Sequence, residues 1–175
     1  MHPLDIDTPR LQLRPLQESD APFILELVNE PAFIANIGDK DVHDLAGARN
    51  YIEKGPQASY RQHGHGLLMV ALRDGGEPVG ICGLVKRDSL PHPDIGYAFL
   101  ARHWGRGYAS EAGAACLEHG RAKLNIPYVV GITAPHNQGS IRVLEKLGLA
   151  YDRTLDLPGI EGPSLYFVPA DAQEK

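Results

Sequence analysis

Apolar residues along the chain follow two spacings, and the shorter one predicts strands. Residues 11–15 alternate between apolar and polar positions, as a half-buried strand does, and residues 128–133 are rich in β-branched side chains. Gly75 and Gly76 lie between two apolar runs and predict the turn that pairs them. The predicted strands are residues 11–15, 67–72, 79–85, 94–100, 128–133, 151–155 and 164–168.

The longer spacing, of three to four residues, predicts helices between these strands. Ser19 or Asp20 can cap a first helix, and Asp44 can cap a second. Asn137 is suited to the same role before a short helix, and Gly148 is suited to the position after it. The predicted helices begin after Asp20 and Asp44 and cover residues 109–124 and 138–147.

The order of these elements, β-α-α-β-β-β-α-β-α-β-β, predicts an α+β fold and not a regular βαβ array. We expect a mixed, mostly antiparallel central sheet of about seven strands flanked by helices. The fourth and fifth strands, residues 94–100 and 128–133, should be parallel neighbours that splay at one end and admit a ligand. One domain should cover residues 1–175, with residues 169–175 as a frayed tail.

A turn that contains two glycines joins the fourth strand to the next helix. It reads Arg102-His103-Trp104-Gly105-Arg106-Gly107-Tyr108-Ala109. Unpaired N–H groups and the helix dipole favour an anion at a helix start, and glycine lets the backbone approach that anion closely. Arg102 and Arg106 add charge beside it. The turn therefore predicts a pyrophosphate site, and we expect Trp104 to pack beneath the loop instead of contacting a cofactor.

Composition narrows the classes of function. The 175 residues carry a net charge of −5, with 43% hydrophobic and 22% charged side chains. This acidic balance gives no sign of a nucleic-acid surface, and no apolar run reaches the roughly 18 residues of a membrane span. Residues 1–5 lack the charged-then-apolar pattern of a signal peptide. We expect a cytoplasmic protein that binds neither nucleic acid nor membrane.

Cysteine and histidine positions do not indicate a metal site. Cys82 and Cys116 fall in a strand-like and a helix-like run, where we interpret both as buried thiols. Among the eight histidines, His63 and His65 form the only close pair, and that pair lacks a third ligand at the usual spacing. We therefore expect no metal.

Three segments carry a resemblance to a known family. Residues 102–112, with the motif Arg-x-x-Gly-x-Gly-Tyr-Ala-Ser-Glu-Ala, resemble the acyl-CoA signature of the GNAT N-acetyltransferases. The sequence of these residues is similar to that of the ribosomal-protein-alanine acetyltransferase (RimJ/RimL-type) branch. Residues 137–149 resemble that branch's Asn-x-x-Ser helix, with Leu149 in place of a phenylalanine. The opening Thr-Pro-Arg-Leu-x-Leu-Arg-Pro at residues 8–15 is also typical of the branch.

The resemblance implies that acetyl-CoA binds as the acyl donor between the fourth and fifth strands. The pantetheine arm would run along residues 99–101, and the N–H groups of residues 102–107 would hold the pyrophosphate. Asn137 would hydrogen-bond the pantetheine side or order the thioester, or would cap its helix, and the two kinds of role can coexist. The implied cofactor-binding residues are Phe99, Leu100, Arg102, Gly105, Arg106, Gly107, Tyr108, Ala109, Asn137 and Ser140.

Acetyl transfer to an amine needs a base for the amine and an acid for the departing thiolate. Many GNAT proteins place an acid tyrosine where this chain has Leu144, so Ser140 is the candidate acid; its alternative role is in the helix cap. Asp94 stands where the branch often has Glu and is the candidate base, acting through a water. Its alternative is a solvated carboxylate at the strand edge. Glu111 is interpreted as structural, in the first turn of its helix.

The acceptor is either a protein N-terminal α-amine or a small-molecule amine. About one lysine amine in 2,500 is neutral at pH 7, against roughly a tenth of α-amines, so a weak base fits an α-amine slightly better. Asp39, Asp41 and Asp44 would favour a cationic small molecule, or form only a solvated face. A catalytically silent acyl-CoA-binding module remains an alternative, and a homodimer through the last strands is a further expectation from the resemblance.

Overall fold

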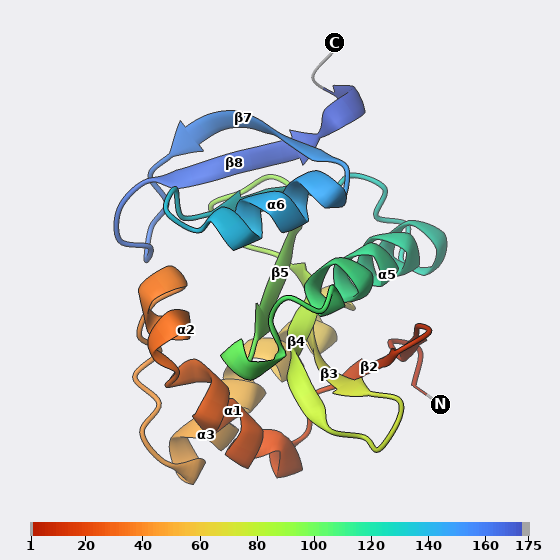
Figure 1. The fold of residues 1–175 in the computed structure, drawn as a ribbon, viewed down its shortest axis with the longest axis vertical. Helices are drawn as coiled ribbons and strands as arrows, with labels where there is room; N and C mark the ends of the chain where they lie inside the picture. Colours follow the sequence, from red (N-terminus) through yellow and green to blue (C-terminus); the bar gives the residue numbers. More distant parts are fainter. Residues whose placement is uncertain (1, 173–175) are drawn as a thin grey trace.

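The protein is built around two β-sheets that meet at one point and diverge from it (Figure 1). A computed structural model describes residues 2–172 of the chain. Within these residues one sheet has the order β1-β2-β3-β4-β5 and the other has the order β6-β8-β7. The strands are β1 (Ile6–Asp7), β2 (Leu11–Pro15), β3 (Leu67–Leu72), β4 (Pro78–Val85), β5 (Asp94–Phe99), β6 (Gly131–Thr133), β7 (Leu149–Leu155) and β8 (Ser164–Pro169).

Helices cover both faces of the larger sheet. α5 packs on one face, and α1 and α3 pack on the other. The helices are α1 (Ala21–Val28), α2 (Pro31–Asn36), α3 (Leu45–Ile52), α4 (Ala58–His63), α5 (Tyr108–Lys123) and α6 (Gln138–Lys146). A π-helical turn at Glu53–Gln57 joins α3 to α4. Among the described residues no helix is long and apolar enough to cross a membrane.

Alternation along each strand separates the cores on the two faces. In β3, Val70 belongs to the cluster beneath α5 and α6, while its neighbour Met69 belongs to the cluster beneath α1 and α3. In β8, Phe167 packs with the α5 side, whereas Tyr166 and Val168 belong to a third cluster on the opposite face. Successive strand side chains point to opposite faces, so the continuous apolar runs of β3 and β4 require helices on both sides.

β5 and β6 meet at a single parallel bridge. Asp94 lies opposite Val130, Ile95 N–H donates to the Val130 carbonyl at 2.9 Å, and Val130 N–H donates to the Pro93 carbonyl at 3.0 Å. Beyond this point β6 pairs with β8 instead, beginning at Gly131. The expected parallel neighbours that splay at one end are therefore confirmed.

One sequence prediction for the end of the chain differs from the structure. The frayed tail predicted from residue 169 is wrong for residues 169–172, since Pro169 ends β8 and Ala170 N–H donates to the Gly148 carbonyl at 2.9 Å. Residues 173–175 lie outside the described residues.

Candidate active site

The loop before α5 has the backbone shape that its glycines predict. A short 3₁₀ turn covers Ala101–His103, and the chain then passes through left-handed conformations at Gly105 (φ 78°) and Gly107 (φ 82°). α5 begins at the next residue, Tyr108. A side chain in the left-handed region costs roughly 1–2 kcal/mol, so both positions favour glycine.

Hydrogen bonds within the loop show which N–H groups are free. The N–H groups of His103 and Trp104 close the 3₁₀ turn onto carbonyls three residues earlier, at 2.9 and 3.1 Å. The N–H groups of residues 105–107 donate no hydrogen bond within the described chain. The expectation that all the N–H groups of residues 102–107 face a pyrophosphate is therefore wrong for His103 and Trp104. The N–H group of Arg102 is also free, and the run of free groups that begins at Gly105 continues into the first turn of α5.

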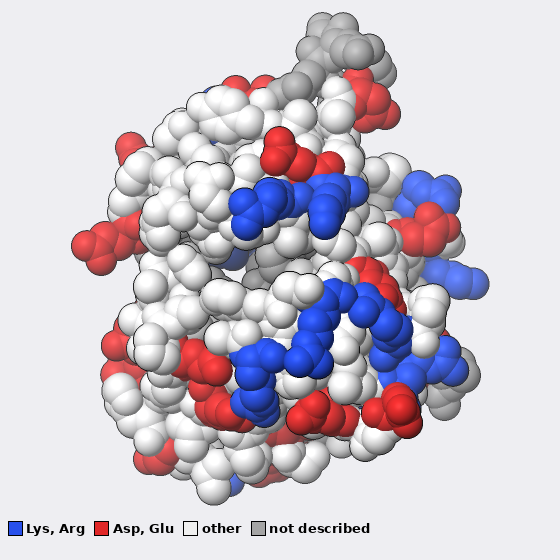
Figure 2. Space-filling view, viewed as in Figure 1, with Lys and Arg blue, Asp and Glu red and all other residues white. Residues whose placement is uncertain are grey.

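Basic side chains flank a hollow between this loop and α6. Figure 2 shows Lys and Arg side chains over both elements, on either side of the hollow. Arg102 is paired with Glu26, Nη1 to Oε2 at 2.8 Å, so its charge is compensated. Arg142 and Lys146 lie on α6. This arrangement suits a ligand with several negative charges.

Glu111 ties the first turn of α5 to the N-terminal segment. Thr8 Oγ1 donates to Glu111 Oε2 at 2.6 Å, and Arg10 donates from its backbone N–H at 3.0 Å and from Nε at 2.7 Å. Arg10 Nη1 also donates to the Arg106 carbonyl at 2.8 Å. Burial raises the pKa of Glu111, but these hydrogen bonds outweigh it and hold the pKa below its usual value. These contacts support a structural role for Glu111. They also show that Arg10 fixes the loop, because it contacts both Glu111 and the Arg106 carbonyl.

The edge of β5 that faces the gap carries free backbone N–H groups. Leu100 N–H donates to the Val79 carbonyl, towards β4, whereas Ile95 N–H donates towards β6. Backbone N–H groups alternate in direction along a strand, so those of Tyr97 and Phe99, like that of Ile95, point away from β4 and into the gap. The side chains of Phe99 and Leu100 are 8% and 0% exposed. A ligand in the gap would meet Phe99 through its backbone, and Leu100 contributes core packing.

Trp104 lies on the outer surface of the loop. Its side chain is 53% exposed, and its indole Nε1–H donates to the Phe99 carbonyl at 2.8 Å. The expectation that Trp104 packs beneath the loop is wrong, because the indole N–H finds its partner at the open edge of β5. A second side chain occupies this edge, since Glu30 Oε1 accepts from Ala101 N–H at 3.0 Å.

Ser140 faces β5 from the start of α6. Its N–H donates to Asn137 Oδ1 at 3.1 Å, which confirms Asn137 as the helix cap. Its hydroxyl lies 2.7 Å from the Tyr97 hydroxyl, which also donates to the Ser140 carbonyl at 3.1 Å. Burial raises the pKa of Tyr97 well above its ordinary value, opposed by the Ser140 hydrogen bond, so Tyr97 keeps its proton. Leu144, at the position of the family's tyrosine, is fully buried in the core.

Sequence reasoning overlooked Tyr97 as a partner of Ser140. The alternation of β5 was the available signal, because Ile95 and Tyr97 lie on the same face and Ile95 belongs to the core beneath α5.

Asp94 lies on the opposite face of β5, where it is 1% exposed. Arg87 Nε donates to Asp94 Oδ2 at 2.9 Å. Burial raises the pKa of Asp94, while Arg87 and Lys86 lower it, and burial prevails. The alternative of a solvated carboxylate at the strand edge is therefore excluded. A raised pKa makes Asp94 a better base than an ordinary aspartate.

Cysteines and metal-binding residue types add little to the site. Cys82 and Cys116 are buried free thiols with their sulfurs 3.8 Å apart, as interpreted from the sequence. Within residues 2–172, no three His, Cys, Asp or Glu side chains form a group that could hold a metal ion.

Comparisons with known proteins agree with this geometry. Residues 10–150 match the family model described as an acetyltransferase (GNAT) domain. The uncharacterised protein YkkB of Bacillus subtilis (strain 168) is 31% identical over 151 residues, which cover 85% of this chain and 86% of YkkB. An acetyltransferase from Agrobacterium tumefaciens str. C58 has 29% identity and a TM-score of 0.78, with 93% of this chain and 92% of that chain covered.

The structure of RimL, a ribosomal L7/L12 α-N-protein acetyltransferase in complex with coenzyme A, has a similar fold. Its TM-score is 0.79 at 18% identity, with 94% of this chain and 96% of that chain covered. Since the family model covers most of the chain and the fold agrees, the chain belongs to the GNAT acetyltransferases and is an acyltransferase.

Proposed function

We propose that the protein transfers an acetyl group from acetyl-CoA to a primary amine by direct attack in a ternary complex. The gap between β5 and β6 carries this proposal, because its open edge leads to the free N–H groups of residues 105–107. Acetyl-CoA needs both features: a strand edge for the amides of its arm, and an anion site for its pyrophosphate. When bound, it supplies the thioester.

The residues of the gap fit that cofactor. Gly105, Arg106 and Gly107 offer their N–H groups to the pyrophosphate, and α5 adds the positive end of its dipole from Tyr108 onwards. A Cβ at Gly105 would meet no heavy atom within 4 Å, so the backbone faces open space there. The N–H group of Phe99 is available to the pantetheine amides.

The candidate acid and base lie on opposite faces of β5. Asp94 accepts a proton from the attacking amine through a water, on the α1 and α3 side. Ser140 gives its hydroxyl proton to the leaving sulfur on the α6 side, and Tyr97 holds that hydroxyl. In this arrangement the amine enters on one face and the thiolate leaves on the other. Such a geometry fits direct attack of the amine on the thioester in one displacement step.

The acceptor class follows less directly from the fold. The RimJ/RimL-type motifs support a protein N-terminal α-amine. Structural neighbours also include a spermidine N-acetyltransferase chimera and AAC(6′)-Ib bound to paromomycin and acetyl-CoA, at 15% and 21% identity. At these identities the likeness concerns the fold alone, so a small-molecule amine stays within the proposal. Buried Leu144 leaves the silent acyl-CoA-binding module as the alternative.

Titration calorimetry of acetyl-CoA tests the cofactor site first. Gly107→Trp places a bulky side chain in the path of the anion, whereas Gly75→Trp imposes the same left-handed strain (φ 88°) in the distant β3–β4 turn. We expect acetyl-CoA to bind the wild type and Gly75→Trp, and to bind Gly107→Trp at least about tenfold more weakly. No binding to the wild type would refute the proposal.

Thiol release over a panel of amines and short peptides then tests turnover. Release with an amine supports the transferase. Binding of acetyl-CoA without release across the panel would support the silent module.

A further inference from the structure

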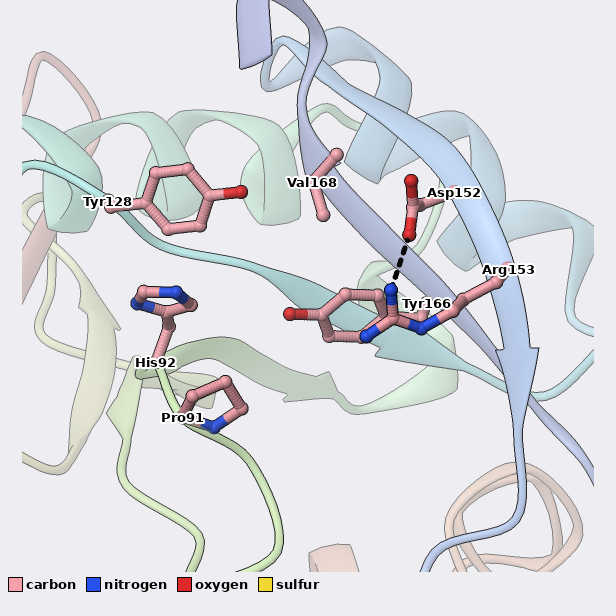
Figure 3. Close-up of a pocket in the computed structure, with 7 residues that line it drawn as sticks. All are labelled: Pro91, His92, Tyr128, Asp152, Arg153, Tyr166 and Val168. Carbon is pink, nitrogen blue, oxygen red and sulfur yellow. Dashed lines mark hydrogen bonds and ion pairs between the residues drawn. The ribbon is translucent and has the colours of Figure 1, made fainter. Parts of the chain in front are cut away.

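A pocket of about 290 Å³ opens on the face of the sheets opposite α5 (Figure 3). The loop before β5, the segment before β6, and strands β7 and β8 supply its walls. Its lining residues are Pro91, His92, Tyr128, Asp152, Arg153, Tyr166 and Val168. No step of the proposed reaction uses them.

This pocket shares a face with Asp94. Asp94 lies opposite Val130 in the parallel bridge, and Ile132 lies opposite Tyr166 in the β6–β8 ladder. Residues two apart on a strand, and residues paired across strands, point to the same side, so these four side chains share one face. Burial raises the pKa of Tyr166, and Asp94 is among the charges that act on it. The pocket therefore lies on the same face of the sheets as the candidate base, which is itself buried beside it in the β5–β6 bridge.

Unpaired polar groups converge in the pocket. Tyr166 is only 4% exposed, yet its hydroxyl makes no hydrogen bond within the described chain, and neither does the hydroxyl of Tyr128. Figure 3 shows both hydroxyls pointing into the middle of the pocket, near His92, whose ring centroid lies 4.4 Å from that of Tyr128. Both hydroxyl oxygens are open to the pocket, where they can exchange hydrogen bonds with a polar ligand.

Charges on this face favour an anionic group over an ammonium. Asp94 is paired with Arg87 at 2.9 Å, and Asp152 is paired with Arg153 at 3.1 Å, so a guanidinium balances each of these carboxylates. Arg153 also lies over the Tyr166 ring, 5.0 Å from its centre, where a ligand cation would otherwise bind. The guanidinium has five N–H donors, and its exposed pair with Asp152 is weak. Two phenol hydroxyls and a guanidinium together suit a charged hydrogen-bond acceptor.

We propose that this pocket binds the carboxylate of the acceptor, so that the substrate is a small amine that also carries a carboxyl group. The inference rests on the acetyltransferase function proposed above. Tyr128 and Tyr166 donate to the carboxylate, and Arg153 balances its charge. The amine end would then extend along this face towards the gap between β5 and β6.

Matched acceptor pairs test the inference. The probes are L-methionine, L-phenylalanine, 4-aminobutanoate and 6-aminohexanoate, each beside its carboxamide, and thiol release gives kcat/KM for each. Arg153→Ala is compared with the wild type on the same acceptor, so that differences in amine pKa within a pair cancel. Arg121→Ala is the control, because Arg121 is 62% exposed and ion-paired on α5, much as Arg153 is 60% exposed and ion-paired on β7.

Arg153→Ala should lower kcat/KM about tenfold to a hundredfold for the free acids and no more than about threefold for the carboxamides. Tyr166→Phe should also act on the acids selectively, whereas Tyr151→Phe on the neighbouring strand and Arg121→Ala should change neither series. Equal losses on acids and carboxamides would overturn the inference. Turnover of carboxamides, peptides or polyamines with no turnover of any free acid would overturn it as well.

The acetyl-CoA titration separates failure of this inference from failure of the proposed function. Wild-type binding of acetyl-CoA, together with turnover only of amines that lack a carboxyl group, would remove the carboxylate pocket and leave the proposed function. Absence of acetyl-CoA binding would remove both.

Discussion

The Glu111 carboxylate receives hydrogen bonds from Thr8 and Arg10, and its pKa in the folded protein is lowered. A carboxyl group whose pKa falls on folding stabilises the fold above its unfolded pKa, about 4.3, and loses that contribution as the pH falls through the folded value. We expect Glu111→Gln to reduce the free energy of unfolding by about 1–3 kcal/mol at pH 7. Urea titrations from pH 7 to pH 3 should show the difference from wild type shrinking below about pH 4.

Glu118→Gln is the control for this change, since Glu118 is 62% exposed and pairs only with exposed Arg121. It should cost well under about 1 kcal/mol at every pH. A pH-independent effect of Glu111→Gln would mean that the charge of Glu111 does not contribute to stability.

Arg87 controls how far burial raises the pKa of Asp94. The guanidinium favours the charged carboxylate, so Arg87→Met should raise that pKa further. A base must be deprotonated to act, and the acid limb of the pH profile of kcat/KM should therefore move to higher pH in Arg87→Met. Arg121→Met, which removes a distant exposed guanidinium, should leave the limb in place. An unmoved acid limb in a folded Arg87→Met would show that Asp94 is not the base.

At the scale of elements, the contact between Tyr97 and Ser140 joins β5 to α6 across the proposed gap. If Tyr97 holds the acid hydroxyl, Tyr97→Phe should lower kcat about tenfold with little change in KM for acetyl-CoA. Ser140→Ala should lower kcat further, and the double variant should match Ser140→Ala alone, because the two groups act as one unit. Steady-state measurement of kcat for the two single variants and the double variant gives this double-mutant cycle.

Tyr60→Phe provides the matched control for loss of a tyrosine hydroxyl. The Tyr60 hydroxyl bonds to the Leu67 carbonyl and accepts from Leu16 N–H, away from the gap. Both tyrosine variants should lower stability, but only Tyr97→Phe should lower kcat. Additive losses in the double variant would indicate a contact that is merely structural.

Sequence patterns predicted the elements that carry their own periodicity. β2 and β3 match the predicted residues 11–15 and 67–72, and α6 begins after Asn137 as its cap required. β1 escaped prediction because two residues, Ile6–Asp7, are too short to show alternation and are fixed only by pairing with β2.

The parts of the candidate site divide in the same way. The glycine loop is local, and its left-handed residues follow from its sequence. Contacts between distant segments leave no local pattern: Arg10 reaches Glu111 across 101 positions, and alternation along β5 indicates the face of Tyr97 but not its contact with Ser140, 43 positions away. Trp104 was misplaced because its partner, the Phe99 carbonyl, is available only at a strand edge that has lost its neighbour. No local pattern records that loss.

At the scale of the whole molecule, the two sheets share one parallel bridge, at Asp94 and Val130, and are otherwise held by side-chain packing. A cofactor whose arm lies between β5 and β6 would replace the missing ladder and couple the two halves. Saturating acetyl-CoA, at about 100 times its Kd, should add about 2.7 kcal/mol of stability. For a chain of this size that corresponds to a rise in Tm of roughly 5–10 °C.

Amide hydrogen exchange shows where acetyl-CoA stabilises the protein. Acetyl-CoA should slow exchange of the Phe99 amide and of the loop amides at residues 105–107, which have no partner within the described chain. 3′-Phosphoadenosine 5′-diphosphate, which has the 3′-phosphate and the 5′-pyrophosphate without the arm, should slow the loop amides and leave Phe99 unchanged. That difference would separate an anion site at the start of α5 from a bridge across the gap. Equal protection of Phe99 by both ligands would contradict an arm that pairs with the edge of β5, because the nucleotide cannot reach that edge.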